Sequence, residues 1–147
     1  MKADISYALH GAVLIVLGLL AGFATAAVAA PNMALAAHTI GILEGTLCIA
    51  LAFLWPVLAS MGYGMGLTRV SLLIGFYSNW LGALLASVWS AKEMAFVTGG
   101  TMPDGAAQWQ ELVVAVLLNL SLLVLLGFIH VAYVLFRVRR QQDTTAS

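Results

Sequence analysis

Four long apolar stretches dominate this sequence and leave few folds open to it. They run over about residues 8–29, 33–59, 68–90 and 111–136. A helix needs about 20 mainly apolar residues to cross the hydrocarbon core of a bilayer, and each stretch reaches that length. We therefore predict an all-α integral membrane protein, built as a four-transmembrane-helix bundle.

Composition agrees with this class of protein. Hydrophobic residues make up 63% of the 147 residues and charged residues only 8%, whereas soluble domains have about 45–50% apolar and roughly 25% charged residues. The net charge is zero, so we expect no nucleic-acid partner. We predict a single membrane domain over residues 1–147.

The connections between the stretches contain turn and loop residues. We expect a very short turn at residues 31–32, a kink or fray at Pro56, and a glycine-rich loop at 61–66. Residues 91–110 are expected to form a polar loop, and residues 141–147 a disordered tail.

Charge placement predicts the orientation. With four spans, one side of the membrane would carry the basic residues Lys2, Arg69, Arg137, Arg139 and Arg140, and the other only Lys92. Cytoplasmic loops carry an excess of lysine and arginine. We therefore predict that both termini are cytoplasmic, in a multi-pass protein of a bacterial-type inner (plasma) membrane.

Two ionisable residues lie within the second stretch, His38 and Glu44. A carboxyl group in hydrocarbon is costly and usually has a function. By helical rise, Glu44 and Asn79 each lie roughly 16 Å from an end of their stretch, and Asn119 lies roughly 12 Å in. These three side chains are predicted to share a layer, with His38 nearer the outer face.

A stripe of small residues continues from His38 through Gly41, Gly45 and Cys48. It would let either a flat cofactor or a neighbouring helix approach the backbone, and helix packing is a common use of such a pattern. Both interpretations stay open from the pattern alone.

Other polar and aromatic residues have simpler explanations. His10 and His130 are expected near the cytoplasmic helix ends, with ordinary hydrogen bonds. Trp55, Trp89 and Trp109 are typical of an interfacial aromatic belt. Trp80 is expected deeper, beside Asn79, as an aromatic wall of a pocket.

Several motifs resemble hydroxylaminobenzene mutase. They are Leu20-Ala21-Gly22-Phe23, the run from Pro31 to His38, Glu44-Gly45, Leu54-Trp55-Pro56, Asn79-Trp80 and Gly99-Gly100. The resemblance implies a membrane isomerase of aromatic degradation that turns an arylhydroxylamine into a 2-aminophenol. It implies a small aromatic substrate. For such a reaction we expect Glu44 and Asn79 to take part in catalysis, and Tyr77, Trp80 and Asn119 to line the substrate pocket.

Ala37-His38, Gly45, Pro56 and Asn79 are also features of styrene oxide isomerase, which the chain resembles more distantly. That resemblance implies a homotrimer with ferric haem b between protomers, His38 as the axial ligand of the iron, and Gly41 and Gly45 against the cofactor. The iron would act as a Lewis acid. Two positions depart from that family, which has asparagine where this chain has Glu44 and tyrosine near Ala83. These departures favour the mutase over an epoxide isomerase.

Two alternatives come from other classes of protein. A small proton-coupled exporter also has four helices around one carboxylate, but on its first helix, where this chain has none. An electron-transfer cytochrome b would need two histidines at one depth. His10 and His130 are expected on the side opposite His38, which disfavours that arrangement.

Overall fold

The structure is a computed structural model, and it describes residues 3–61, 64–91 and 105–145. Every regular element in these ranges is helical. The elements are α1 (Ile5–Ala24), a short 3-10 helix η1 (Thr25–Ala27), α2 (Pro31–Met61), α3 (Met65–Trp89), α4 (Gln108–Leu120) and α5 (Leu122–Thr145).

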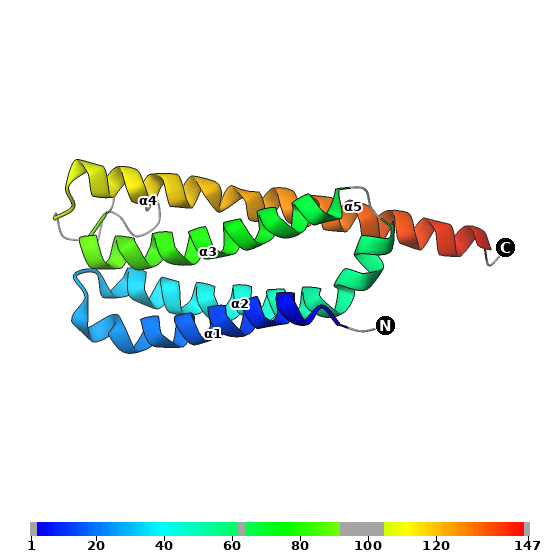
Figure 1. The fold of residues 1–147 in the computed structure, drawn as a ribbon. Helices are drawn as coiled ribbons and strands as arrows, with labels where there is room; N and C mark the ends of the chain where they lie inside the picture. The colour runs from blue at the N-terminus through cyan, green and yellow to red at the C-terminus, as the bar shows by residue number, and fades with distance from the viewer. Residues whose placement is uncertain (1–2, 62–63, 92–104, 146–147) are drawn as a thin grey trace.

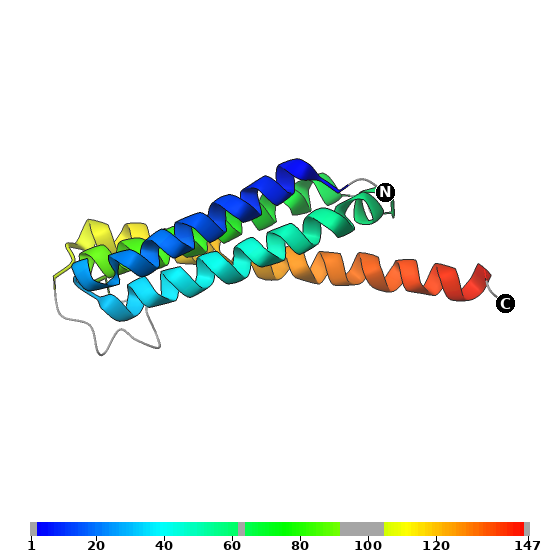
Figure 2. The same ribbon diagram turned by 90° about the horizontal axis from the view of Figure 1, so that it is seen from below.

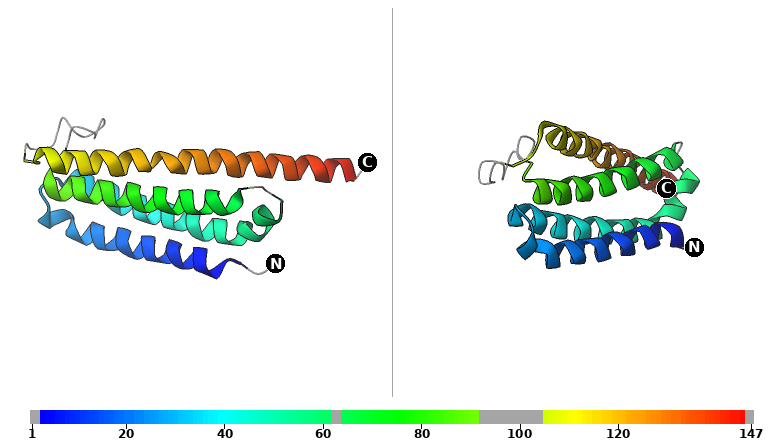
Figure 3. Two further views of the ribbon diagram at one scale, coloured as in Figure 1. Left: turned by 45° about the horizontal axis from the view of Figure 1, so that its top comes forward. Right: turned by 60° about the vertical axis from the view of Figure 1, so that its left-hand side comes forward.

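The helices pack in chain order. α1 lies along α2, α2 along α3, and α3 along the rod formed by α4 and α5 (Figure 1). Both termini lie at the same end of the bundle, and the C-terminal part of α5 extends beyond the other helices (Figures 2 and 3). This arrangement places α2 and α3 at the centre, where polar side chains can be enclosed.

Glycines set the close approach of α1 to α2. A Cβ atom added to Gly11 would lie 2.5 Å from the carbonyl oxygen of Gly45, and one added to Gly41 would lie 2.6 Å from the Cα of Gly18. Small residues allow membrane helices to pack backbone against backbone. The two helices are therefore held in one register.

The helices expose a largely apolar surface. Four helical stretches are long and apolar enough to span a bilayer: Ile5–Ala27, Pro31–Ser60, Met65–Trp89 and Gln108–Arg140. Large apolar side chains such as Phe23, Leu67 and Leu126 are exposed, as expected where lipid replaces water as the solvent. The prediction of four apolar helices is confirmed.

Helix starts differ from the sequence predictions at two places. Pro31 is the first residue of α2 and does not form the predicted turn with Asn32. Proline suits the first position of a helix, because that position needs no N–H partner. The loop predicted at 61–66 is also too long, because α3 already begins at Met65. Gly64, whose φ is 78°, is the N-cap residue of this helix.

Pro56 lies inside α2, which continues to Met61. The last turns are angled away from the rest of the helix (Figure 1). A proline inside a helix removes one backbone hydrogen bond and bends the axis. The kink predicted at Pro56 is therefore present.

The last predicted span is divided and longer than expected. α4 ends at Leu120 and α5 begins at Leu122, with Ser121 between them donating its hydroxyl to the Leu118 carbonyl. The tail predicted to be disordered is helical as far as Thr145. Arginines and glutamines at the start of this tail and just before it favour helix, and the Arg140 guanidinium lies 5.1 Å from the Phe136 ring centre.

Some sequence predictions concern residues outside the described ranges. They include Lys2, Gly62, Tyr63, Lys92, Glu93, Gly99, Gly100, Pro103, Asp104, Ala146 and Ser147. The polar loop predicted at 91–110 is described only at Ala91 and from Gly105 onward. There, α4 already begins at Gln108, whose preceding residue Ala107 donates its backbone N–H to the Gln110 side chain at 2.7 Å.

Polar contacts at the end that holds the termini join three helices. Both terminal nitrogens of the Arg69 guanidinium contact the Asp4 carboxylate, at 3.0 and 3.1 Å. Arg69 also lies 5.4 Å from the Tyr7 ring centre, and Tyr7 stacks on Trp55. Trp55 is thus a buried core residue, and the prediction that it belongs to an interfacial belt is wrong.

Candidate functional site

Glu44 is buried between α2 and α3, with a relative exposure of 7%. Asn79 of α3 donates a hydrogen bond from Nδ2 to Glu44 Oε1 at 2.8 Å. The other carboxyl oxygen, Oε2, is buried and has no hydrogen-bond partner. Buried polar atoms are nearly always satisfied, so this oxygen is available to an additional group.

Trp80 follows Asn79 on α3 and is also buried, with an exposure of 9%. Its ring N–H is buried without a hydrogen-bond partner. An indole N–H can only donate. The structure therefore places an unused acceptor, at Glu44, and an unused donor, at Trp80, on neighbouring central helices.

Tyr77 lies one turn away on α3 and bridges to α1. Its hydroxyl and Nδ1 of His10 are 3.2 Å apart, and the two rings meet edge to face with centres 5.8 Å apart. Sequence reasoning did not single out His10 as a site residue, because nothing in the local sequence shows which helix faces it.

His38 projects toward α1. Its Nδ1 lies 2.9 Å from the Gly18 carbonyl oxygen, and because a carbonyl can only accept, Nδ1 carries the proton of that bond. A neutral imidazole in this tautomer leaves Nε2 with a free lone pair. The half-buried ring makes no second hydrogen bond among the residues that the structure describes.

Gly22 makes room for this imidazole. A Cβ atom on Gly22 would lie 2.6 Å from His38 Nδ1 and 3.1 Å from Cε1. The position of the ring is therefore set by α1 from two sides, through the Gly18 carbonyl and the missing side chain at Gly22.

The glycine stripe below His38 is filled by protein. Gly41 faces Gly18, and Gly45 faces Gly11, at distances that leave no space for a side chain. The expectation that Gly41 and Gly45 contact a cofactor is therefore contradicted within the chain. Helix packing, the other interpretation of the stripe, is what the structure contains.

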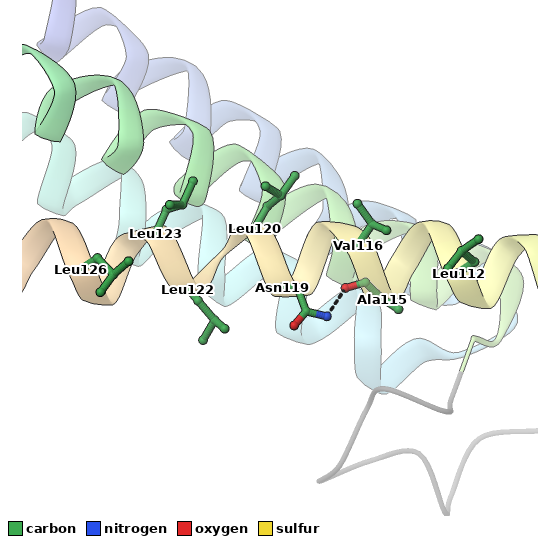
Figure 4. A pocket seen from close by; sticks show the side chains of 8 residues that line it. All are labelled: Leu112, Ala115, Val116, Asn119, Leu120, Leu122, Leu123 and Leu126. Carbon is green, nitrogen blue, oxygen red and sulfur yellow. Dashed lines mark hydrogen bonds between the residues drawn. The ribbon is translucent and has the colours of Figure 1, made fainter.

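Asn119 does not join Glu44 and Asn79. It lies near their level, since Gly82 and Gly75 of α3 pack against Leu118 and Val124. Its side chain, however, points outward and donates Nδ2 to the Ala115 carbonyl of its own helix at 2.8 Å (Figure 4). Helical rise fixes the depth of a residue along a helix but not the direction in which its side chain points.

An apolar groove surrounds Asn119 on the outer face of α4 and α5. It has a volume of about 520 Å³ and is lined by Leu112, Ala115, Val116, Asn119, Leu120, Leu122, Leu123 and Leu126. Figure 4 shows these side chains along one side of the rod. The prediction that Asn119 lines a pocket beside Glu44 is therefore wrong within a single chain.

His38 and Glu44 face different helices. His38 contacts α1, whereas Glu44 bonds to α3. This agrees with helix geometry, because a rotation of about 100° per residue places side chains six residues apart at about 120° to each other. No described contact joins them within one chain, so a chamber shared by the two would need a further component.

The other histidines are occupied by different partners. His130 Nδ1 is hydrogen bonded to the Thr68 hydroxyl, which ties α5 to α3. His10 lies beside Gly11, whereas His38 lies at Gly18 and Gly22, so the two are separated by roughly 12 Å along α1. At that separation His10 and His38 cannot bind the two faces of one haem, and no group of three metal-binding side chains occurs among the described residues.

Comparisons with known proteins agree on one type of chemistry. A family model described as styrene oxide isomerase matches residues 5–136. Hydroxylaminobenzene mutase HabB of Ectopseudomonas oleovorans is 37% identical over 115 residues, covering 76% of this chain and 68% of that protein. Hydroxylaminobenzene mutase HabA of the same organism is 38% identical over 81 residues, covering 55% of this chain and 60% of that protein. No solved structure gave a significant match.

Proposed function

Because the chain belongs to the styrene oxide isomerase family and is therefore an isomerase, we propose that it rearranges an arylhydroxylamine to a 2-aminophenol. Hydroxylaminobenzene is the proposed substrate, because both relatives are named hydroxylaminobenzene mutase. The observation that carries the proposal is the buried Glu44 carboxyl, with one oxygen held by Asn79 and the other unpaired.

The proposed reaction moves one oxygen within the substrate. The N–O bond breaks, a C–O bond forms at the ortho carbon, that carbon loses its proton as aromaticity returns, and the nitrogen gains a proton to become the amine. No electrons are gained or lost overall. The difficult step is the departure of oxygen from nitrogen, which a positioned acid assists by protonation.

Glu44 is the proposed acid and base. Oε1 is engaged by Asn79, so Oε2 is the atom that would hold the proton, give it to the departing oxygen, and take up the proton from the ring carbon. Once bonded to carbon, the oxygen would pass its extra proton to the nitrogen, which becomes the amine. Asn79 is the proposed orienting residue, because its amide fixes the carboxyl plane. One group serving in both directions matches a reaction with no net proton change.

An apolar and aromatic environment suits this substrate. Tyr77 and Trp80 flank Asn79 on α3 and offer rings that can stack on an aryl group. Exclusion of water would protect an electron-poor aryl intermediate from being trapped. An aromatic substrate would reach such a site by partitioning into the bilayer.

The geometry at His38 is compatible with haem. Nδ1–H bonded to a backbone carbonyl is a common arrangement for metal-binding histidine, because it orients the ring and leaves Nε2 for the metal. When bound, haem b would supply a ferric Lewis acid. The glycine stripe contributes no haem contact here, so the ring itself is the proposed attachment.

A homotrimer is the proposed assembly. The His38 ring is only half-buried and faces away from Glu44, so a neighbouring protomer would be needed to bring a group bound at His38 against a Glu44 site. We place the trimer in a bacterial inner membrane with both termini cytoplasmic. Arg69 and the basic residues of α5 lie toward the end of the bundle that holds the termini, which agrees with the positive-inside rule.

The activity is tested with purified protein in detergent or liposomes. Conversion of hydroxylaminobenzene to 2-aminophenol is followed by chromatography, without added reductant. Glu44→Gln should lower kcat by about 10²–10⁴-fold, whereas Glu111→Gln, which removes a carboxylate at the start of α4, should not. Full activity of a folded Glu44→Gln variant would exclude Glu44 from the chemistry.

The haem proposal has a separate test. The purified protein, produced with sufficient haem, should show a Soret band that His38→Ala removes or shifts. A protein that is active and colourless would rule haem out while leaving the rearrangement intact.

Epoxide isomerisation is the second candidate, favoured by the description of the matching family. Styrene oxide offered in the same assay distinguishes the two reactions. The higher kcat/KM identifies the better substrate, and a preference for the epoxide would overturn the mutase proposal.

A further inference from the structure

The pair His10 and Tyr77 joins α1 to α3 at the height of Glu44. Gly11, the neighbour of His10, packs on Gly45, the neighbour of Glu44. Tyr77 is two residues from Asn79, which binds Glu44. The His10–Tyr77 and Glu44–Asn79 pairs therefore lie at one level of the bundle, on three different helices.

Cys48 lies beside Glu44 on α2. It is fully buried one turn after Glu44 on α2. The Tyr77 hydroxyl, held by His10, therefore lies at the level of this buried segment of α2.

A phenol hydroxyl rotates freely unless a partner fixes it. His10 Nδ1, 3.2 Å away, occupies one of its hydrogen-bond positions in either tautomer. The remaining positions are left for another polar group. An arylhydroxylamine brings both an N–H and an O–H, and Glu44 can engage only one end of its N–O bond.

We propose that Tyr77 is a substrate-binding residue of the isomerase site and that His10, on α1, is the positioning residue that orients the Tyr77 hydroxyl toward the N–O group. This inference rests on the proposed function. It extends the site from α2 and α3 to α1 and explains why a half-buried histidine faces a tyrosine at this depth.

The experiment is a double-variant cycle measured on hydroxylaminobenzene turnover. Tyr77→Phe and His10→Ala should each lower kcat/KM by about tenfold, the effect of one lost hydrogen bond. The double variant should lose no more than either single variant, because His10 acts only through the hydroxyl. His10→Asn, which can place an amide near the position of Nδ1, should recover most of the activity, and Tyr133→Phe, on an exposed tyrosine of α5, is the control.

The outcomes separate this inference from the function itself. A wild-type protein without the rearrangement overturns the proposed function. If the wild type is active, multiplicative losses in the double variant, or full activity of His10→Ala, overturn the role of His10. Equal melting temperatures for the variants exclude unfolding as the cause, and a failed rescue by His10→Asn together with a lowered melting temperature would identify a purely structural contact.

Discussion

Asn79 donates a hydrogen bond to Glu44 at 2.8 Å, joining the two central helices inside an apolar bundle. The bond satisfies one carboxyl oxygen and leaves the other unpaired. A bundle selected only for stability would avoid this arrangement, because an unsatisfied buried polar atom is costly. The arrangement is understandable if the free oxygen is used in a reaction.

The energetic link between Glu44 and Asn79 can be measured. Asn79→Leu should lower the free energy of unfolding by about 1–3 kcal/mol, because it leaves the carboxyl unsatisfied. The double variant Glu44→Leu/Asn79→Leu should recover much of that loss, since replacing both partners removes the unsatisfied group. Unfolding in SDS or by heat, followed by circular dichroism, measures both, and a double variant less stable than Asn79→Leu would contradict the argument.

Gly22→Ala should displace the His38 imidazole, since the added methyl group would lie 2.6 Å from Nδ1. We expect a loss of stability of about 1–3 kcal/mol, typical of overpacking, and loss of the Gly18 hydrogen bond, visible in the ¹⁵N shift of His38. Gly66→Ala is the matched control, because nothing lies within 4 Å of its added carbon. Equal behaviour of the two variants would show that Gly22 is not a steric requirement.

Asn119→Leu tests the correction to the predicted pocket. The side chain points outward from α4 and bonds only to the Ala115 carbonyl among the described residues. Stability of the folded chain should change by no more than about 0.5 kcal/mol, and kcat should not change. Loss of kcat with an unchanged fold would show that Asn119 acts on the reaction, through another protomer.

Arg69→Ala should loosen the end of the bundle that holds the termini. The guanidinium contacts Asp4 through two nitrogens and covers the Tyr7 ring, and hydrogen bonds to charged groups contribute about 1.5–3 kcal/mol each. We expect a lower melting temperature, with Arg69→Lys intermediate because lysine cannot form the two-pronged contact. Arg139→Ala, on an exposed residue of α5, should leave the melting temperature unchanged.

Much of the fold followed from the sequence. Four apolar stretches predicted four long helices, because a membrane requires every backbone group to be hydrogen bonded within its own segment. The kink at Pro56 followed from the covalent structure of proline. Helix ends were less accurate, as at Pro31 and in the tail to Thr145, because capping and side-chain contacts beyond the apolar stretches decide them.

The sequence by itself determined which polar residues enter the membrane and how deep they lie, because helical rise converts residue number into depth. Only the tertiary structure decided their partners. It paired Glu44 with Asn79 and His10 with Tyr77, turned Asn119 outward, and filled the stripe at Gly41 and Gly45 with α1. The physical reason is that the rotation of each helix about its axis depends on contacts with its neighbours, which no single stretch of sequence contains.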